Sequence, residues 1–227
     1  MRILAVDTSS ERGSVCVAQA GEVLGEVRLS SSIQHSERLF GSIEFLFRYL
    51  PFQLKDIELF VSARGPGSFT GLRVGLAATE GFAAAFRVRK AGVSTLEAVA
   101  WNAGATDALI AATIDARRSE VYGALYRRVG NELIEQTAPV VLKPAAWFTS
   151  LPKERIVFCG DGAIRYRDII EEHSDWNVGN IDLYLARAMA EIAFMHGGGP
   201  MQPLYVRKTD AEIARERLHE SIGSPHP

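Results

Sequence analysis

The chain has 227 residues, of which 47% are hydrophobic, and a formal net charge of −2. This length and hydrophobic content are enough to bury a large core, as one big domain or as two smaller lobes. Charges of both signs are interspersed without a basic stripe, which argues against tight autonomous binding to a nucleic-acid backbone.

The cysteine count and the hydropathy pattern exclude other classes. The chain contains only Cys16 and Cys159, and no apolar run approaches the ~18 residues that a membrane span needs. No secretory signal precedes the first strand-like segment, so we expect a cytoplasmic protein with both thiols reduced and no contact with a membrane. Cysteine and histidine do not recur at ligand spacing, so we expect no metal and no cofactor.

The first half of the chain alternates between strand-like and helical patterns. Pro51 ends the first helix, and the basic cluster Arg87, Arg89 and Lys90 is interpreted as the solvated end of the second helix. In chain order the predicted elements are strands at 2–8, 13–20, 22–29 and 57–63 and helices at 36–50, 71–86 and 96–103.

The second half repeats this pattern. A strand-like run at 108–114 ends in Asp115, as the first strand of the chain ends in Asp7. Asp182 is expected to cap the last helix, which a run of glycines ends. The predicted elements are strands at 108–114, 121–127, 132–137 and 156–159 and helices beginning at Pro144 and spanning 163–172 and 182–195.

The repetition predicts two tandem α/β halves. We expect an N-terminal lobe at 1–103, a C-terminal lobe at 104–207 and a charged tail at 208–227. Within the tail, residues 208–220 have a composition compatible with a helix, and 221–227 are expected to be disordered.

A glycine-rich loop connects the strand at 57–63 to the helix at 71–86. Its glycines and its proline predict a tight turn, and two hydroxyl side chains are placed to cap the helix. A helix N-terminus can hold an anion, but the loop lacks the last glycine of a dinucleotide-binding motif and the lysine of a P-loop. We therefore interpret it as a structural loop. Its residues are Gly65, Pro66, Gly67, Ser68, Thr70 and Gly71.

Five segments in the same order carry a family resemblance. They are RILAVDTS at the start, RGPGSFTGLRVGLAATEGFA from Arg64, GVSTL from Gly92, IDAR with EVY at 114–122, and PLYVR at 203–207. Together they resemble the TsaB (YeaZ) family over nearly the whole chain. These are bacterial accessory proteins of tRNA threonylcarbamoyladenosine (t6A) synthesis. The resemblance implies the actin/Hsp70/sugar-kinase-like (ASKHA) fold, an α/β fold of two mixed-sheet lobes with flanking helices.

The resemblance also implies a function. A TsaB-like chain is expected to be a non-catalytic scaffold that binds TsaD and acts with the ATPase TsaE. The complex transfers a threonylcarbamoyl group to N6 of the adenosine next to the anticodon, and this chain would meet tRNA only through that complex. TsaD carries a histidine pair for its metal, whereas no two histidines of this chain stand four residues apart on one helix.

Two helices are the candidate partner interface. The segments 36–50 and 71–86 are more apolar than contact with one sheet requires, so we expect them to pair with TsaD, or with a second copy when the chain is alone. The alternative is that both helices merely cover the sheet. If the helices form an interface, Leu39→Glu or Gly75→Arg is expected to abolish pairing and to leave the fold intact, whereas unfolding of these variants would favour the alternative. The predicted interface residues are Leu39, Phe40, Ile43, Phe47, Leu72, Gly75, Leu76 and Thr79.

A second hypothesis is an enzyme. Asp7 and Asp115 stand at corresponding strand ends, where an actin-like phosphotransferase or ATPase positions Mg-ATP. Thr8 follows the first of them, and Gly160 and Gly162 precede a helix. These five residues are the candidates for nucleotide binding. The structural interpretation, which we favour, is that the aspartates stabilise turns.

Overall fold

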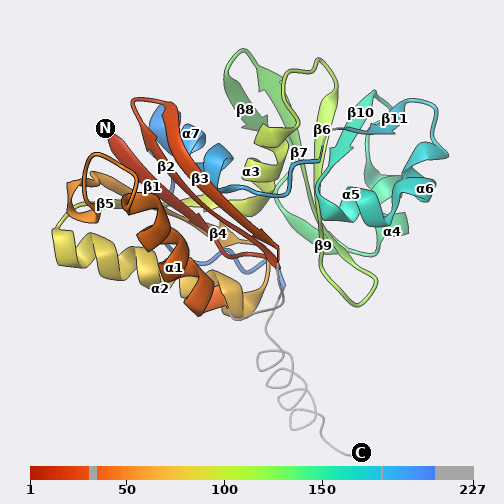
Figure 1. The fold of residues 1–227 in the computed structure, drawn as a ribbon. Helices are drawn as coiled ribbons and strands as arrows, with labels where there is room; N and C mark the ends of the chain where they lie inside the picture. Colours follow the sequence, from red (N-terminus) through yellow and green to blue (C-terminus); the bar gives the residue numbers. More distant parts are fainter. Residues whose placement is uncertain (31–34, 180, 208–227) are drawn as a thin grey trace, which may run out of the picture.

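The computed structural model describes residues 1–30, 35–179 and 181–207. Within them the chain forms two β-sheets with helices on their outer sides and between them (Figure 1). The predicted helix at 208–220 and the predicted disordered end at 221–227 lie outside the described residues. Within the part of the chain that the structure describes, every helix is too short or too polar to span a bilayer.

The first sheet has the strand order β3-β2-β1-β4-β5. Strands β1, β2 and β3 are antiparallel neighbours, whereas β1, β4 and β5 run parallel. A short 3-10 turn, Leu54–Asp56, precedes β4. The bounds are β1 Arg2–Asp7, β2 Arg12–Gln19, β3 Glu22–Ser30, β4 Leu59–Gly65 and β5 Arg89–Ser94.

The second sheet repeats this arrangement in the order β11-β10-β6-β7-β8. Strand β6 takes the place of β1, with antiparallel β7 and β8 on one side and parallel β10 and β11 on the other. The predicted internal duplication is therefore confirmed. The bounds are β6 Leu109–Asp115, β7 Val121–Val129, β8 Glu132–Glu135, β10 Ile156–Cys159 and β11 Trp176–Val178, with β9 Val140–Leu142 beside β7.

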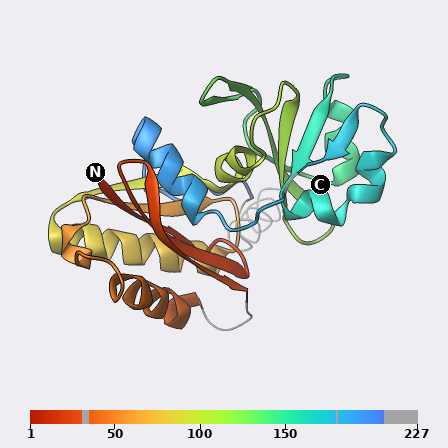
Figure 2. The ribbon, with the colours of Figure 1, turned by 45° about the horizontal axis from the view of Figure 1, so that its top comes forward.

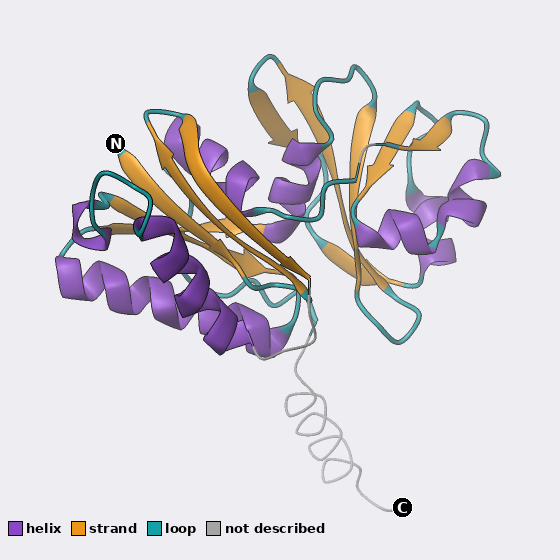
Figure 3. Ribbon diagram, viewed as in Figure 1, coloured by secondary structure: helices purple, strands orange, loops and turns teal. Residues whose placement is uncertain are grey.

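The elements stack in five layers. Helices α1 (His35–Phe47) and α2 (Phe69–Phe86) cover one face of the first sheet, while α3 (Thr95–Asn102) and α7 (Ala186–His196) lie on its other face, against the second sheet (Figure 2). The short helices α4 (Pro144–Ser150), α5 (Asp161–Arg165) and α6 (Arg167–Glu171) cover the far side of the second sheet (Figure 3). This architecture is the ASKHA fold.

Alternation along the strands explains the layers. On β1, Leu4 and Val6 point to α1 and α2, whereas Ile3 and Ala5 point to α3 and α7. The core around α3 and α7 also contains residues of the second sheet, such as Tyr126. The two lobes therefore share one central hydrophobic core rather than meeting at a polar seam.

The chain returns to the first lobe at its C-terminal end. Helix α7 lies against β1 and β2, and the segment after it, residues 197–207, is here called the return strap. The strap pairs with β5 through Gly199 and Gly92, and the Leu204 N–H donates to the Arg64 carbonyl at 2.7 Å. The division at residue 103 remains a prediction, but α7 and the strap, both within 104–207, pack on the first sheet.

Several predicted boundaries differ from the structure. Strands β9 and β11 are only three residues long and were not predicted. Arg89 and Lys90 begin β5 instead of ending a helix, because α2 stops at Phe86 and Arg87 turns left-handed with a φ of 56°. The predicted helix at 163–172 is two short helices, α5 and α6.

The last helix begins later than predicted. Asp182 does not cap it, because its side chain accepts the Tyr184 N–H at 3.0 Å and forms a turn before the helix. Helix α7 starts at Ala186. Gly197, with a φ of 78°, ends it as expected.

Candidate functional site

The turn after β1 holds the first predicted aspartate. Asp7 is fully buried, and its Oδ1 accepts the Ser9 N–H at 2.9 Å. Its Oδ2 accepts no hydrogen bond within the described part of the chain. Burial raises the pKa of Asp7 to about 6, against the lowering effect of the Ser9 hydrogen bonds. The carboxyl group therefore stabilises a turn, as the structural interpretation of the sequence predicts.

The glycine loop closes directly on this turn. The Ser68 N–H donates to the Ser9 carbonyl at 2.7 Å, and Thr8 Oγ1 donates to the Gly71 carbonyl at 2.7 Å. A Cβ at Gly67 would lie 2.6 Å from the Ser9 oxygen, and one at Gly71 would collide with the Thr8 oxygen. These glycines permit close packing of two backbones, so the loop leaves no cradle for a phosphate.

The caps and the remaining loop residues have distinct roles. Ser68 caps α2 by accepting the Gly71 N–H at 3.3 Å, as predicted, whereas Thr70 lies inside the helix and is not a cap. Gly65 has a φ of 110° and is followed by a cis bond to Pro66. A Cβ there would lie 2.9 Å from the Leu204 oxygen, so Gly65 admits the return strap.

In the corresponding turn of the second half, both carboxylate oxygens of Asp115 accept hydrogen bonds. Asp115 Oδ1 accepts the Arg117 N–H at 2.9 Å, and its Oδ2 accepts from Arg165 Nη1 at 2.7 Å. The Asp115 N–H donates to Asp161 Oδ1 at 2.9 Å. Burial raises the pKa of Asp161. A carboxylate held by an arginine side chain and a backbone amide is poorly placed to bind a metal ion.

Gly160 and Gly162 repeat the role of Gly67 and Gly71. A Cβ at Gly160 would collide with the Thr113 carbonyl oxygen, and one at Gly162 would lie 3.0 Å from Thr113 Cβ. Both glycines therefore bring α5 onto the end of β6, and neither lies open for an adenosine. Among the residues that the structure describes, no group of histidine, cysteine and acidic side chains has the composition of a metal site.

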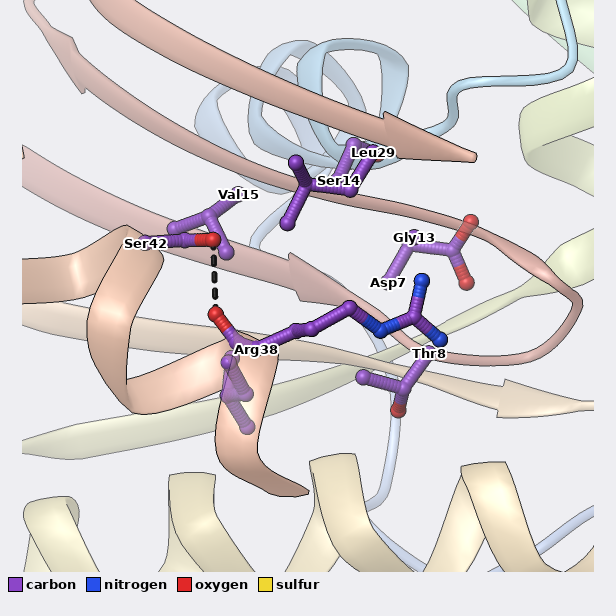
Figure 4. Close-up of a pocket in the computed structure, with 9 residues that line it drawn as sticks. Asp7, Thr8, Gly13, Ser14, Val15, Leu29, Arg38 and Ser42 are labelled. Atoms are coloured by element: carbon purple, nitrogen blue, oxygen red, sulfur yellow. Dashed lines mark hydrogen bonds between the residues drawn. The ribbon is translucent and has the colours of Figure 1, made fainter. Parts of the chain in front are cut away.

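A small cavity lies beside Asp7, on the side of α1 (Figure 4). Arg38 extends from α1 toward Asp7 and Thr8, and Ser42 Oγ donates to the Arg38 carbonyl at 2.7 Å. The volume of about 20 Å³ is enough for a water molecule and far too small for a nucleotide.

The large cavity is the cleft between the two lobes, with a volume of about 1110 Å³. Its floor is apolar and includes Leu72, Ile114 and Leu185. Three acidic residues, Glu11, Asp115 and Asp161, also line it, and they are outnumbered by arginines. The arginines are Arg12, Arg73, Arg117, Arg118, Arg165 and Arg207.

An aromatic pair stands at the side of this inter-lobe cleft. The rings of Phe69, at the start of α2, and Tyr205, in the return strap, have centroids 5.5 Å apart. The guanidinium of Arg73 lies over the Phe69 ring, with Cζ 3.8 Å from its centroid. Sequence reasoning missed this group, because Phe69 and Tyr205 are distant in the chain. The only signal was that each lies in a segment that carries the family resemblance.

The predicted interface residues are mostly not on the surface. Phe40 is 52% exposed and Phe47 is half-buried, but the other six pack inside this chain. These six residues are buried within the described chain, so the interface proposed below uses other residues of the same two helices. The six buried residues are Leu39, Ile43, Leu72, Gly75, Leu76 and Thr79.

A different set of side chains forms the outer side of the same two helices. On α1, Phe40, Phe45 and Tyr49 just beyond its end are 52%, 53% and 74% exposed. On α2, the exposed side includes small residues such as Ala77, Gly81 and Ala84. A Cβ added at Gly81, or at Gly41 on α1, would meet nothing within 4 Å. We call this the α1–α2 surface; its residues are Phe40, Gly41, Phe45, Tyr49, Ala77, Gly81 and Ala84.

Comparisons with known proteins agree with this architecture. Residues 22–173 match the family model "TsaD: tRNA N6-adenosine threonylcarbamoyltransferase". The chain is 30% identical to the Bacillus subtilis tRNA threonylcarbamoyladenosine biosynthesis protein TsaB, over 93% of this chain and 96% of that protein. It is 38% identical to the Escherichia coli TsaB over 63% of each chain.

A solved structure gives the same result. The chain superposes on YeaZ from Pseudomonas aeruginosa with a TM-score of 0.77 and 26% identity. The match covers 90% of this chain and 99% of YeaZ. With its similarity to TsaB along nearly the whole chain and its superposition on YeaZ, the chain belongs to the TsaB (YeaZ) family.

Proposed function

We propose that this chain is a non-catalytic subunit that binds TsaD through the α1–α2 surface and acts with TsaE in the t6A modification of tRNA. The observation that carries the proposal is the α1–α2 surface itself. Three aromatic side chains are more than half exposed there, and a Cβ at either of its two helix glycines would face open space. Exposed apolar patches of this kind mark protein interfaces.

The two glycines support a helical partner. A glycine inside a helix costs about 1 kcal/mol relative to alanine, and nothing within the described chain requires Gly41 or Gly81 to lack a side chain. A neighbouring helix that approaches α2 closely over Ala77 and Gly81 would explain the glycine at position 81. The family resemblance implies that TsaD is similar in fold to this chain. TsaD is therefore the expected partner.

The strand-end turns support a role without catalysis. The glycine loop fills the space beside Asp7, and Arg165 and the Arg117 amide occupy both oxygens of Asp115. An actin-like phosphotransferase needs these turns open to phosphate and metal. The alternative enzyme hypothesis, with Asp7 and Asp115 as its catalytic residues, is therefore the less supported one.

A matched pair of substitutions tests the interface. Ala77 lies exposed on α2, and Ala146 lies exposed on α4 of the other lobe. Ala77→Arg is expected to abolish co-purification with TsaD and t6A formation by reconstituted TsaD and TsaE, because the large cation blocks close helix approach. Ala146→Arg is expected to leave both unchanged. Both variants are expected to melt as the wild type does.

Two outcomes would contradict the proposal. The first is an Ala77→Arg variant that still forms the complex with TsaD. The second is a TsaD preparation that modifies tRNA at full rate without this chain. In the absence of TsaD the same surface is expected to pair two copies of the chain, so Ala77→Arg is also expected to elute as a monomer on sizing.

A further inference from the structure

We propose that the inter-lobe cleft binds a single-stranded RNA segment, with one base stacked on the column of Arg73, Phe69 and Tyr205. The inference deepens the proposed function and rests on it, because it gives the chain a contact of its own with the RNA substrate. It concerns a surface different from the α1–α2 surface, so the two proposals fail separately.

The neighbouring planar groups of Arg73, Phe69 and Tyr205 are the first observation. The Phe69 and Tyr205 rings are tilted by 35° at 5.5 Å, and the Arg73 guanidinium lies 3.8 Å from the Phe69 centroid. Phe69 is 41% exposed and Tyr205 is 45% exposed. All three side chains line the inter-lobe cleft. Aromatic rings and guanidinium planes are the groups on which proteins stack unpaired bases.

The charge of the cleft is the second observation. Six arginines and three acidic residues line it. Arg117 pairs with Glu11 at 3.4 Å, and Arg165 is held by Asp115. Neither Arg12 nor Arg73 makes a side-chain ion pair to the residues that the structure describes, and the Arg73 guanidinium lies over the Phe69 ring. Arg12 and Arg73 are therefore placed to meet phosphates beside the stacked base.

The shape of the site favours a strand over a free nucleotide. Both strand-end turns are filled by glycine loops or ion pairs, so the cleft has no cradle for a terminal phosphate group. Its cations are spread over both lobes. A strand with one phosphate per nucleotide matches dispersed cations, and the volume of about 1110 Å³ accommodates more than one nucleotide.

The overall charge sets the expected strength. A net charge of −2 does not support tight binding through phosphates alone. Stacking must carry a large part of the affinity, and the complex with RNA is expected to be weaker than that of a dedicated RNA-binding domain. Removal of one aromatic ring is therefore expected to cause a measurable decrease in RNA affinity.

Fluorescence anisotropy with labelled oligoadenylate and oligouridylate tests the proposal on the isolated chain. Phe69→Ala and Tyr205→Ala are expected to weaken binding by about tenfold or more. Tyr205→Phe, which retains the ring, is expected to bind within about twofold of the wild type. Phe194→Ala removes a ring on α7 that is 41% exposed, as Phe69 is, and that lies outside the cleft, so it is the matched control.

The arginine contribution has its own readout. Arg73→Ala is expected to weaken binding and to reduce the slope of log K against log salt by about 0.7 for each phosphate that the protein no longer neutralises. Arg167→Ala, an exposed arginine on α6, is expected to change neither quantity. Thermal melting of each variant establishes that the fold is retained. Tyr205→Leu, which removes the ring and keeps a large apolar side chain, replaces an alanine variant that unfolds.

Three results would overturn the inference: no binding of either RNA by the wild type, equal losses in Phe194→Ala and Phe69→Ala, or displacement of RNA by Mg-ATP at similar concentrations. The last would make the cleft a mononucleotide site. Each variant is also tested for co-purification with TsaD. If the wild type pairs with TsaD but binds no RNA, this inference alone is wrong. If the wild type binds RNA but does not pair with TsaD, the scaffold proposal is wrong.

Discussion

At the scale of single residues, Asp7 is a fully buried carboxyl group whose titration is expected to affect stability. Its pKa in the folded chain is about 6, above the ordinary value of 3.8, because burial disfavours the carboxylate. The folded state therefore binds a proton more tightly than the unfolded state does. This contribution is favourable at low pH and is lost as the pH rises from about 4 to about 6.

Asp7→Asn is expected to remove the loss of stability that the wild type shows as the pH rises. The amide oxygen can still accept the Ser9 N–H, and the side chain no longer ionises. At pH 7.5 the variant is expected to be more stable than the wild type by at most about 3 kcal/mol, with the difference vanishing near pH 4. Urea unfolding at several pH values measures this. A variant that is less stable at pH 7.5 would mean that the ionised Asp7 has a stabilising partner.

Two glycines of α2 make a second prediction at this scale. Gly75→Ala would place a Cβ 2.5 Å from Thr8 Oγ1, whereas Gly81→Ala would place one in open space. We expect Gly75→Ala to destabilise the fold by about 1–3 kcal/mol and Gly81→Ala to stabilise it by about 0.5–1 kcal/mol. Urea unfolding measures the change in the free energy of unfolding for each variant. A change of the same sign in both variants would contradict the packing described.

The same contacts revise an expectation drawn from the sequence. Leu39 is 3% exposed and Gly75 is buried against the Thr8 turn. Leu39→Glu and Gly75→Arg are thus expected to disrupt the core instead of selectively blocking a partner. Both substitutions are poor probes of pairing, and Ala77→Arg replaces them.

At the scale of elements, patterns within the sequence located most helices and strands. The ends of β1 and β6 in Asp7 and Asp115, the Ser68 cap and the duplication were predictable, since each depends on a few adjacent residues. Strands β9 and β11 were not, because three residues carry no periodicity. Arg89 and Lys90 join a strand through their pairing with β4, which a charged composition does not reveal.

The candidate sites show where such reasoning stops. An apolar helix face indicates that something covers it, but the sequence does not say whether the cover is the sheet or a partner. The sheet covers Leu39 and Ile43 in this chain, and Phe45 and Tyr49 stay outside. The cleft column was beyond prediction for another reason. Phe69 and Tyr205 meet only because the chain returns to the first lobe after building the second.

At the scale of the whole molecule, the return strap connects the lobes at the edge of the cleft. Arg207 Nη1 donates to the Ala116 carbonyl at 2.8 Å, and the guanidinium also pairs with Glu120. Arg207→Ala is expected to raise hydrogen exchange in the strap and in the turn at 116–120. The melting temperature is expected to change by no more than a few degrees, because the lobes also share a core.

Arg127→Ala is the matched control for that experiment. Arg127 pairs with Glu154 at 2.7 Å inside the second lobe, so its loss is expected to leave the strap protected. Faster exchange throughout both lobes in Arg207→Ala would mean that the strap, and not the shared core, holds the lobes together.

The position of α7 has a consequence for how the protein is made. Met189, Ile192 and Ala193 of this helix are buried in the core that also covers β1. The first lobe is therefore translated first but completed last, and the part of its inner face that α7 covers, over β1 and β2, stays exposed on the ribosome until α7 has emerged. A nascent chain in that state exposes an apolar sheet, which makes it a client for chaperones throughout the synthesis of the second lobe.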